Sequence, residues 1–241
     1  MRIWIAAVLL IVVPWVAVGQ DAALRKLVTA NDTHGWEAVG RINIGASAFC
    51  TGTLIAPQIV LTAAHCLFDQ QSGKAFAPAD FEFLAGWRGG RAAAYRKVLR
   101  AVTHPDYIYE GRDRMDRVAF DLALLELDQP IRLASIPPFA TGGDPATGTR
   151  VGILSYALDR ADAPSLQDSC HVLGRQPGVL VLSCLVDFGS SGAPVFTMRD
   201  GRPEIVSVIS AKAELDHELV ALGTAMEQPL SELRAAFATG T

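Results

Sequence analysis

The stretch that decides the fold of this chain runs from Leu61 to Cys66 and reads LTAAHC. It places a histidine and a cysteine directly after an apolar, strand-like run. A histidine in this position is more often a structural hydrogen-bonding group than a catalyst, so the stretch alone predicts no chemistry. Two later stretches change the interpretation: residues 120–125 read FDLALL, and residues 189–194 read GSSGAP. Together the three supply His, Asp and Ser, the side chains of a nucleophilic triad.

The composition around these stretches is that of a globular protein. Of 241 residues, 50% are hydrophobic and 19% are charged, which excludes low-complexity, collagen-like and disordered classes. The net charge of −4 provides no broad basic surface, so we expect neither nucleic acid nor anionic lipid as a partner. The chain holds 13 Pro and 21 Gly without a repeat period, which favours many short strands joined by turns.

Strand-like runs recur along the chain, and no long helical pattern separates them. They cover residues 38–44, 49–55, 58–62, 81–85, 96–102, 122–127, 151–157, 179–186, 204–210 and 220–226. This pattern predicts an all-β fold of antiparallel barrels or sandwiches. A Pro- and Gly-rich break at residues 136–148 divides the chain into an N-terminal unit, residues 36–135, and a C-terminal unit, residues 136–241. A helix is predicted near the C-terminus, where Leu230, Leu233 and Phe237 share one face.

The N-terminus has the pattern of a secretory signal peptide over residues 1–19. Arg2 precedes an apolar run that ends at the small residues Ala17 and Gly19. The alternative, an uncleaved membrane anchor, is disfavoured because the run contains Pro14 and is shorter than the roughly 20 apolar residues that a span needs. We therefore expect a secreted or periplasmic protein that has no membrane contact after cleavage. Residues 20–35 are either a propeptide or an N-terminal arm.

Export makes the cysteines candidates for disulfide bonds, because compartments beyond the cytosol are oxidising. The sequence leaves the connectivity open among three possibilities, of which nearest-neighbour pairing is the simplest. A zinc site is the alternative, but the chain has no C-x-x-C pair and its histidines lack ligand spacing, so we expect no metal and no cofactor. The candidates are Cys50, Cys66, Cys170 and Cys184.

The three stretches resemble the motifs of trypsin-like (chymotrypsin-fold) serine proteases: TAAHC at the base, D(I/L)ALL at the orienting acid, and GDSGGP at the nucleophile. The first two match at every position, whereas in the third Ser190 replaces the Asp and Ala193 replaces the last Gly. The resemblance covers about Trp36 to Phe237 and is nearest to bacterial glutamyl-endopeptidase-like members. It implies two antiparallel six-stranded β-barrels with the active site in the cleft between them, plus a C-terminal α-helix.

The order of the residues also argues against an α/β-hydrolase, which runs Ser, Asp, His and requires G-x-S-x-G. In the trypsin-like reading, Ser191 is the nucleophile and His65 takes its proton, since imidazole titrates close to pH 6.5. Asp121 holds His65 in one tautomer. The resemblance further implies an oxyanion hole formed by the backbone N–H groups of Gly189 and Ser191, and a disulfide between Cys50 and Cys66.

The resemblance also implies residues that contact substrate. Leu185 occupies the position of the pocket floor, where trypsins carry an acid, so an apolar or small substrate side chain is expected. Phe188 precedes the oxyanion glycine, and Ser210 matches the serine that bonds the buried acid and lines the cleft. Ser190 carries no charge to pair with a freshly cut N-terminal ammonium, so we expect activity without that ion pair.

These inferences together predict a secreted serine endopeptidase that hydrolyses protein or peptide substrates through a Ser-His-Asp triad and an acyl-enzyme intermediate, and that is monomeric. The alternative is a catalytically inactive protease homologue that acts as a secreted binding module. Such homologues usually lack a triad residue, whereas His65, Asp121 and Ser191 are all present.

Overall fold

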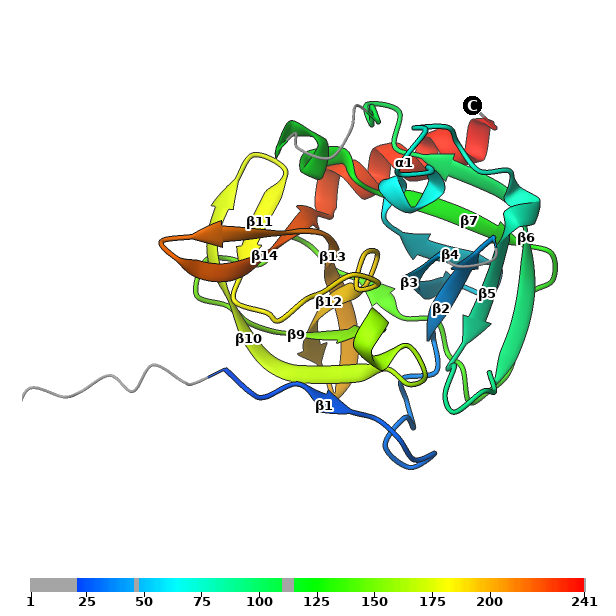
Figure 1. The fold of residues 1–241 in the computed structure, drawn as a ribbon, viewed down its shortest axis with the longest axis horizontal. Coiled ribbons are helices and arrows are strands. Elements are labelled where there is room, and N and C mark those ends of the chain that lie inside the picture. The colour runs from blue at the N-terminus through cyan, green and yellow to red at the C-terminus, as the bar shows by residue number, and fades with distance from the viewer. Residues whose placement is uncertain (1–20, 46–47, 110–114, 241) are drawn as a thin grey trace, which may run out of the picture.

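The computed structural model describes residues 21–45, 48–109 and 115–240 of the chain. The predicted signal peptide, residues 1–19, lies outside the described residues. Two β-barrels stand side by side, and a helix runs along one end of the N-terminal barrel (Figure 1). The predicted all-β fold of two six-stranded antiparallel barrels with a C-terminal helix is confirmed.

The N-terminal barrel closes in the strand order β2-β3-β4-β7-β6-β5, and every pairing is antiparallel. Its interior is filled by large apolar side chains that are completely buried, among them Ile42, Leu54 and Phe83. The strands are β2 (Val39–Ile44), β3 (Ala48–Ala56), β4 (Ile59–Thr62), β5 (Phe81–Ala85), β6 (Ala94–Thr103) and β7 (Ala123–Leu127).

The C-terminal barrel closes in the order β9-β10-β11-β14-β13-β12, because β12 also pairs with β9. Two short strands extend this sheet: β1 (Arg25–Lys26) pairs with β10, and β8 (Ala140–Thr141) runs parallel to β13. The barrel strands are β9 (Arg150–Ser155), β10 (Ser165–Gln176), β11 (Val179–Leu182), β12 (Pro194–Arg199), β13 (Arg202–Leu215) and β14 (Glu218–Ala225).

Helix α1 (Glu227–Thr239) joins the two barrels, since it follows β14 of the C-terminal barrel and packs on β6 and β7 of the N-terminal one. Leu230 and Leu233 are buried in the same core as the N-terminal strands. The helix starts where Asp144 Oδ1 accepts the backbone N–H groups of Met226 and Glu227. Four short 3₁₀ helices complete the described elements: η1 (Ala64–Leu67), η2 (Pro78–Asp80), η3 (Met115–Phe120) and η4 (Leu158–Arg160).

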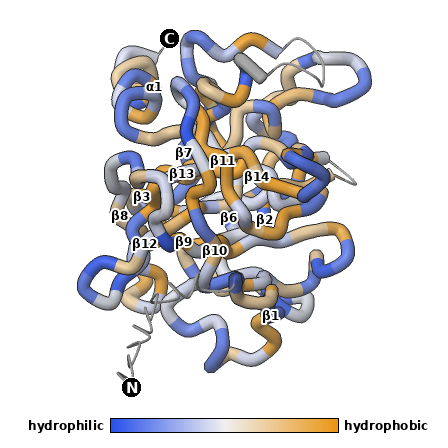
Figure 2. Tube along the Cα trace, turned by 90° about the vertical axis from the view of Figure 1, so that its left-hand side faces the viewer, coloured by the Kyte–Doolittle hydropathy of each residue, from blue (hydrophilic) through white to orange (hydrophobic). Residues whose placement is uncertain are grey.

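The strands observed differ from the predicted runs at a few places. β10 and β12 were not predicted, and the run at residues 179–186 ends as a strand at Leu182. Hydrophobic residues concentrate in the strands and hydrophilic residues in the surface loops (Figure 2). Among the helices of the described residues, none combines the length and the apolar character required to cross a membrane.

Candidate active site

Strand pairing brings His65 and Asp121 together. His65 lies in η1, shortly after β4 ends at Thr62, and Asp121 lies between η3 and the start of β7 at Ala123. Thr62 and Ala123 are direct partners in the antiparallel pair β4–β7. The end of one strand therefore meets the beginning of the other, and the two side chains project from the same edge of the barrel.

The carboxylate of Asp121 is fully buried and is bonded on both of its oxygens. Oδ2 lies 2.6 Å from His65 Nδ1, and Oδ1 accepts the backbone N–H of His65 at 2.8 Å. Ser210 Oγ from the C-terminal barrel also donates to Oδ2. Burial alone would raise the pKa of Asp121, but the charge of His65 and the hydrogen bonds from His65 and Ser210 outweigh burial and lower it.

This arrangement fixes the tautomer of His65. An ionised carboxylate only accepts hydrogen bonds, so the ring nitrogen that faces Asp121, Nδ1, carries the proton. In the neutral imidazole the other nitrogen, Nε2, then holds a lone pair and can accept a proton. The pair thus has the chemistry of a general base and its orienting acid.

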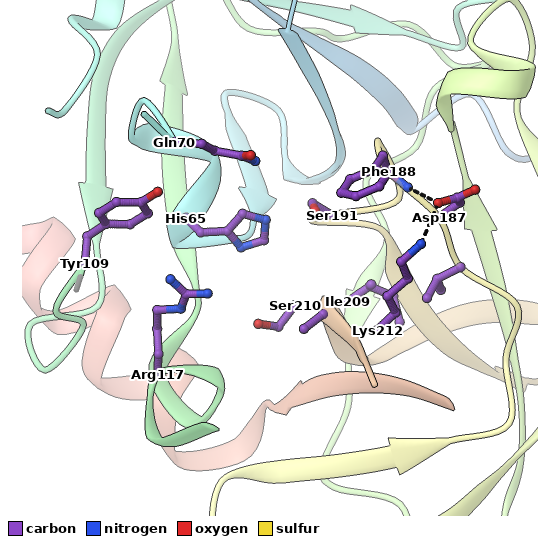
Figure 3. A pocket seen from close by; sticks show the side chains of 12 residues that line it. His65, Gln70, Tyr109, Arg117, Asp187, Phe188, Ser191, Ile209, Ser210 and Lys212 are labelled. Atoms are coloured by element: carbon purple, nitrogen blue, oxygen red, sulfur yellow. Dashed lines mark hydrogen bonds and ion pairs between the residues drawn. The ribbon is translucent and has the colours of Figure 1, made fainter. Parts of the chain in front are cut away.

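Ser191 lies in the loop between β11 and β12, residues 183–193, which we call the serine loop. It lines the same cleft as His65. The cleft has a volume of about 290 Å³, and the two side chains face each other across it (Figure 3). No hydrogen bond joins Ser191 Oγ to His65 within the part of the chain that the structure describes. In unliganded enzymes such bonds are often long and tighten only when substrate binds.

A residue that the sequence did not single out, Thr51 of β3, ties the serine loop to the N-terminal barrel. Its backbone N–H donates to the carbonyl of Ser191 at 2.8 Å, and its hydroxyl donates to the carbonyl of Gly189 at 2.9 Å. The same hydroxyl accepts the N–H of Tyr156 at 3.1 Å. Thr51 is completely buried, so these bonds are shielded from water.

Two glycines let the serine loop pass close to other backbone. A Cβ on Gly192 would lie 2.1 Å from Thr62 Oγ1 and 2.2 Å from the carbonyl of Thr51, and φ is +79° there. A Cβ on Gly189, where φ is +95°, would lie 2.4 Å from the ring of Phe49. Both positions therefore need a residue without a side chain.

The backbone N–H groups of Gly189 and Ser191, the predicted oxyanion donors, are not used in hydrogen bonds to other described residues. The carbonyl of Phe188 accepts the N–H of Leu158 at 2.9 Å. Because this peptide is trans, the N–H of Gly189 points to the opposite side. Among the described residues, no protein acceptor is paired with the backbone N–H of Gly189 or of Ser191. Two donors thus remain available beside the serine hydroxyl.

Ser190, which stands at the position of the family's acid, is buried and makes only neutral contacts. Its Oγ donates to Ser155 Oγ at 3.2 Å and lies 3.4 Å from the carbonyl of Tyr156. It also accepts the N–H of Asp187 at 3.3 Å. These contacts connect the serine loop to the neighbouring loop without any charged group.

The predicted substrate-binding residues lie in different places. Ser210 and Phe188 line the cleft, and Phe188 is 61% exposed. Leu185 does not line it and instead borders a smaller neighbouring hollow, whereas the next residue, Val186, lines both. The N–H of Leu185 donates to Gln167 Oε1 of β10 at 2.8 Å, a long-range contact that no local pattern shows.

The disulfide bonds follow nearest-neighbour pairing, as predicted. Cys50 is bonded to Cys66, and Cys170 is bonded to Cys184, with S–S distances of 1.98 and 2.02 Å. The first bond joins β3 to η1 directly beside His65. It thereby ties the element that carries His65 to the barrel wall.

Two groups of possible metal ligands occur among the described residues, and the chemistry of neither suits a metal. One contains Cys50, His65 and Cys66, but both sulfurs are in a disulfide and are not thiolates. The other contains His104 with Asp106 and Glu232. The N–H of Asp106 donates to His104 Nδ1, so the ring proton is on Nε2, which faces Glu232 at 3.1 Å and has no lone pair for a metal.

Two closed six-stranded barrels with a His–Asp pair facing a serine across one cleft define the chymotrypsin class of fold. Residues 50–204 match the family model of the trypsin-like peptidase domain, and the chain belongs to this family. The resemblance drawn from the three motifs is thus confirmed.

Comparison with individual proteins gives the same assignment. The chain is 26% identical to glutamyl endopeptidase of Bacillus licheniformis over 77% of its own length and 56% of that protein. It is 33% identical to trypsin of Saccharopolyspora erythraea over 36% of its length and 34% of that protein. A solved structure of a Glu endopeptidase in complex with MPD superposes with a TM-score of 0.73 at 21% identity, covering 94% of this chain and all (100%) of the other, which shows a shared fold. The chain spans only about half of the Bacillus relative.

Proposed function

We propose that the protein is a serine endopeptidase that acts outside the cytoplasm. The observation that carries this proposal is the His65–Asp121 pair, with Nδ1 and Oδ2 2.6 Å apart, facing Ser191 across one cleft. Membership in the trypsin-like peptidase family supports it independently.

In the first half of the proposed reaction, Ser191 Oγ attacks the carbonyl carbon of the scissile peptide bond while its proton passes to His65 Nε2. The resulting oxyanion is stabilised by the N–H groups of Gly189 and Ser191. A donor of this kind typically lowers the barrier by about 3 kcal/mol. The carbon–nitrogen bond then breaks, His65 gives the proton to the leaving amine, and the acyl group stays on Ser191 as an ester.

In the second half, water takes the place of the amine. His65 Nε2 accepts a proton from water, the oxygen attacks the ester carbon, and Ser191 leaves with the proton that His65 returns. Asp121 remains ionised throughout and stabilises the cation of His65, in keeping with its lowered pKa. The bonds and protons of both halves are thus accounted for by substrate, Ser191, His65 and water, with Asp121 and the two N–H groups stabilising the charges that form.

Export is supported by the signal-peptide pattern of the first residues and by the two disulfide bonds. The substrate class is protein or peptide, because Ser191 and His65 line one cleft and the matched relatives are named as proteases.

A fluorophosphonate probe tests the proposal directly, because it reacts with a serine only where a base activates the hydroxyl. We expect the purified protein to be labelled and to hydrolyse casein, and Ser191→Ala to do neither. Ser72→Ala, which removes an exposed hydroxyl that does not line the cleft, is the control and should be labelled like the wild type. If the wild type is not labelled, the protein is a binding module instead.

A further inference from the structure

One ion pair stands between the catalytic cleft and a second hollow. The second hollow has a volume of about 120 Å³ and is lined by apolar residues of β14 and of the segment after β11. Val186, Asp187 and Lys212 line both spaces, so they form the wall between them. The remaining residues around the second hollow are Cys184, Leu185, Leu219 and Val220.

The charged part of this wall is Lys212 of β13 with Asp187 of the serine loop. Lys212 Nζ lies 2.9 Å from Asp187 Oδ1 and 4.6 Å from the centre of the Phe188 ring (Figure 3). Asp187 Oδ1 also accepts the N–H of Phe188 at 2.8 Å. The hydrogen bond from Lys212 and the N–H of Phe188 lower the pKa of Asp187, so the carboxylate is ionised at neutral pH.

The position of the pair beside Ser191 gives it a consequence for substrate choice. Val186, Ile209 and Lys212 line the cleft together with Ser191, so the side chain of the acyl-side residue, whose carbonyl Ser191 attacks, meets them if it enters this part of the cleft. A long apolar side chain would have to displace two charged groups to reach the second hollow. A charged side chain would meet an ammonium and a carboxylate that already neutralise each other.

We propose that the Lys212–Asp187 pair is a selectivity gate that closes the apolar hollow and restricts the acyl-side residue to short, uncharged side chains. This inference rests on the proposed endopeptidase function. The pair is half-exposed, and exposed ion pairs attract only weakly. The selectivity therefore comes from placing charged groups in an apolar wall, and not from the strength of their attraction.

The gate makes reciprocal predictions for its two halves. Asp187→Asn keeps an oxygen for the N–H of Phe188 but leaves the ammonium of Lys212 uncompensated, which favours an acidic acyl-side residue. Lys212→Ala leaves the carboxylate of Asp187 uncompensated, which favours a basic one. The double variant removes both charges and opens the hollow to a long apolar side chain.

The experiment measures kcat/KM for four peptides that differ only in the acyl-side residue, which is Ala, Leu, Glu or Lys. The wild type should cleave the Ala peptide fastest. In each variant we compare kcat/KM of a peptide with that of the Ala peptide. We expect this ratio to rise about tenfold for the Glu peptide in Asp187→Asn and about tenfold for the Lys peptide in Lys212→Ala. For the Leu peptide it should rise about tenfold when Asp187→Asn and Lys212→Ala are combined.

The matched control is the ion pair of Lys26 and Asp162, which are 2.6 Å apart at the surface and do not line the cleft. Lys26→Ala and Asp162→Asn should leave every ratio unchanged. If the gate variants also leave all ratios unchanged, the gate does not exist. Fluorophosphonate titration of the same samples counts the folded active sites. If the gate variants are labelled but their kcat/KM ratios equal those of the wild type, only the gate is overturned. If the wild type is not labelled, both the proposed function and the gate are overturned.

Discussion

The two barrels contribute to the active site in different ways. The N-terminal barrel holds His65 and Asp121 at the edge of the paired strands β4 and β7, with Asp121 fully buried. The C-terminal barrel presents Ser191 on a loop that contains two glycines of positive φ, Gly189 and Gly192. Strand pairing thus positions the proposed acid and base, whereas the position of the proposed nucleophile depends on contacts made by its loop.

Those contacts cross from one barrel to the other in both directions. Thr51 of the N-terminal barrel bonds the carbonyls of Gly189 and Ser191, and Ser210 of the C-terminal barrel bonds Asp121. Ser210 lies at a bulge in β13, where the register with β14 shifts between Ile209 and Ala211. A bulge redirects a side chain, and here the redirected hydroxyl reaches the acid of the other barrel.

The largest effect is expected from the acid of the N-terminal barrel. Asp121→Asn keeps the shape of the side chain but favours the wrong tautomer of His65, so kcat should fall about 10⁴-fold, as in the general serine-protease template. Steady-state hydrolysis of a peptide ester measures it. Asp128→Asn, at the opposite end of β7, is the control and should have near-normal activity. A loss of tenfold or less in Asp121→Asn would contradict its role.

The next largest effect is expected from the loop of the C-terminal barrel. In Gly189→Ala the new Cβ would meet Phe49 and Ala157, so the loop must shift and misplace an oxyanion donor. We expect kcat to fall about 10²- to 10³-fold, the cost of losing one such donor. Gly201→Ala separates this effect from backbone strain alone, because Gly201 also has positive φ but its Cβ would meet nothing within 4 Å. Equal kcat values for the two variants would refute the assignment.

A smaller effect is expected from the link between the barrels. Thr51→Val leaves the N–H of Tyr156 and the carbonyl of Gly189 without their partner. Because a buried unsatisfied group costs about 1–3 kcal/mol, kcat/KM should fall about tenfold. Thr51→Ser should restore activity. Thr53→Val, on the same strand, removes a buried hydroxyl that has no hydrogen-bond partner among the described residues and should be harmless. Equal activity of Thr51→Val and Thr53→Val would show that the link is not needed.

The smallest effect is expected from the N-terminus. The hydroxyl of Ser190 bonds the neutral groups of Ser155 and Tyr156, so we expect the serine loop to keep its geometry without a terminal ammonium. A protein that begins at Leu27 should therefore be no more active than one that begins at Gln20, although it lacks β1. Active-site titration of both forms measures it. A large rise in activity on trimming would mean that a new N-terminus switches the enzyme on.

Sequence patterns predicted most of this fold, because apolar runs between turn residues mark strands with one or two buried faces. β10 escaped prediction because polar residues such as Gln167 and Ser165 are buried in it, and Gln167 is paired with Ala22 and Leu185, far away in the chain. β12 escaped prediction because it begins at Pro194, the last residue of the GSSGAP motif, which was interpreted as part of the catalytic site.

The candidate site likewise contains residues that the sequence predicted and residues that only the structure shows. The residues of the proposed triad, His65, Asp121 and Ser191, could be selected from the sequence because each lies in a short local motif. Thr51 and Lys212 could not be selected, since their proposed roles come only from what the folded chain places beside them. Counting back from Ser191 selected Leu185 for the cleft, whereas its bond to Gln167 places it beside the neighbouring hollow and leaves Val186 in the cleft.

A crystal structure of the protein after reaction with a peptidyl phosphonate would test the central claim most directly. We predict a bond from Ser191 Oγ to phosphorus, with a phosphonate oxygen about 3 Å from the N–H groups of Gly189 and Ser191, and His65 Nε2 within hydrogen-bond distance of the adduct. A phosphonate attached to another residue, or one whose oxygens both point away from these amides, would contradict the catalytic roles assigned to the residues of the two barrels.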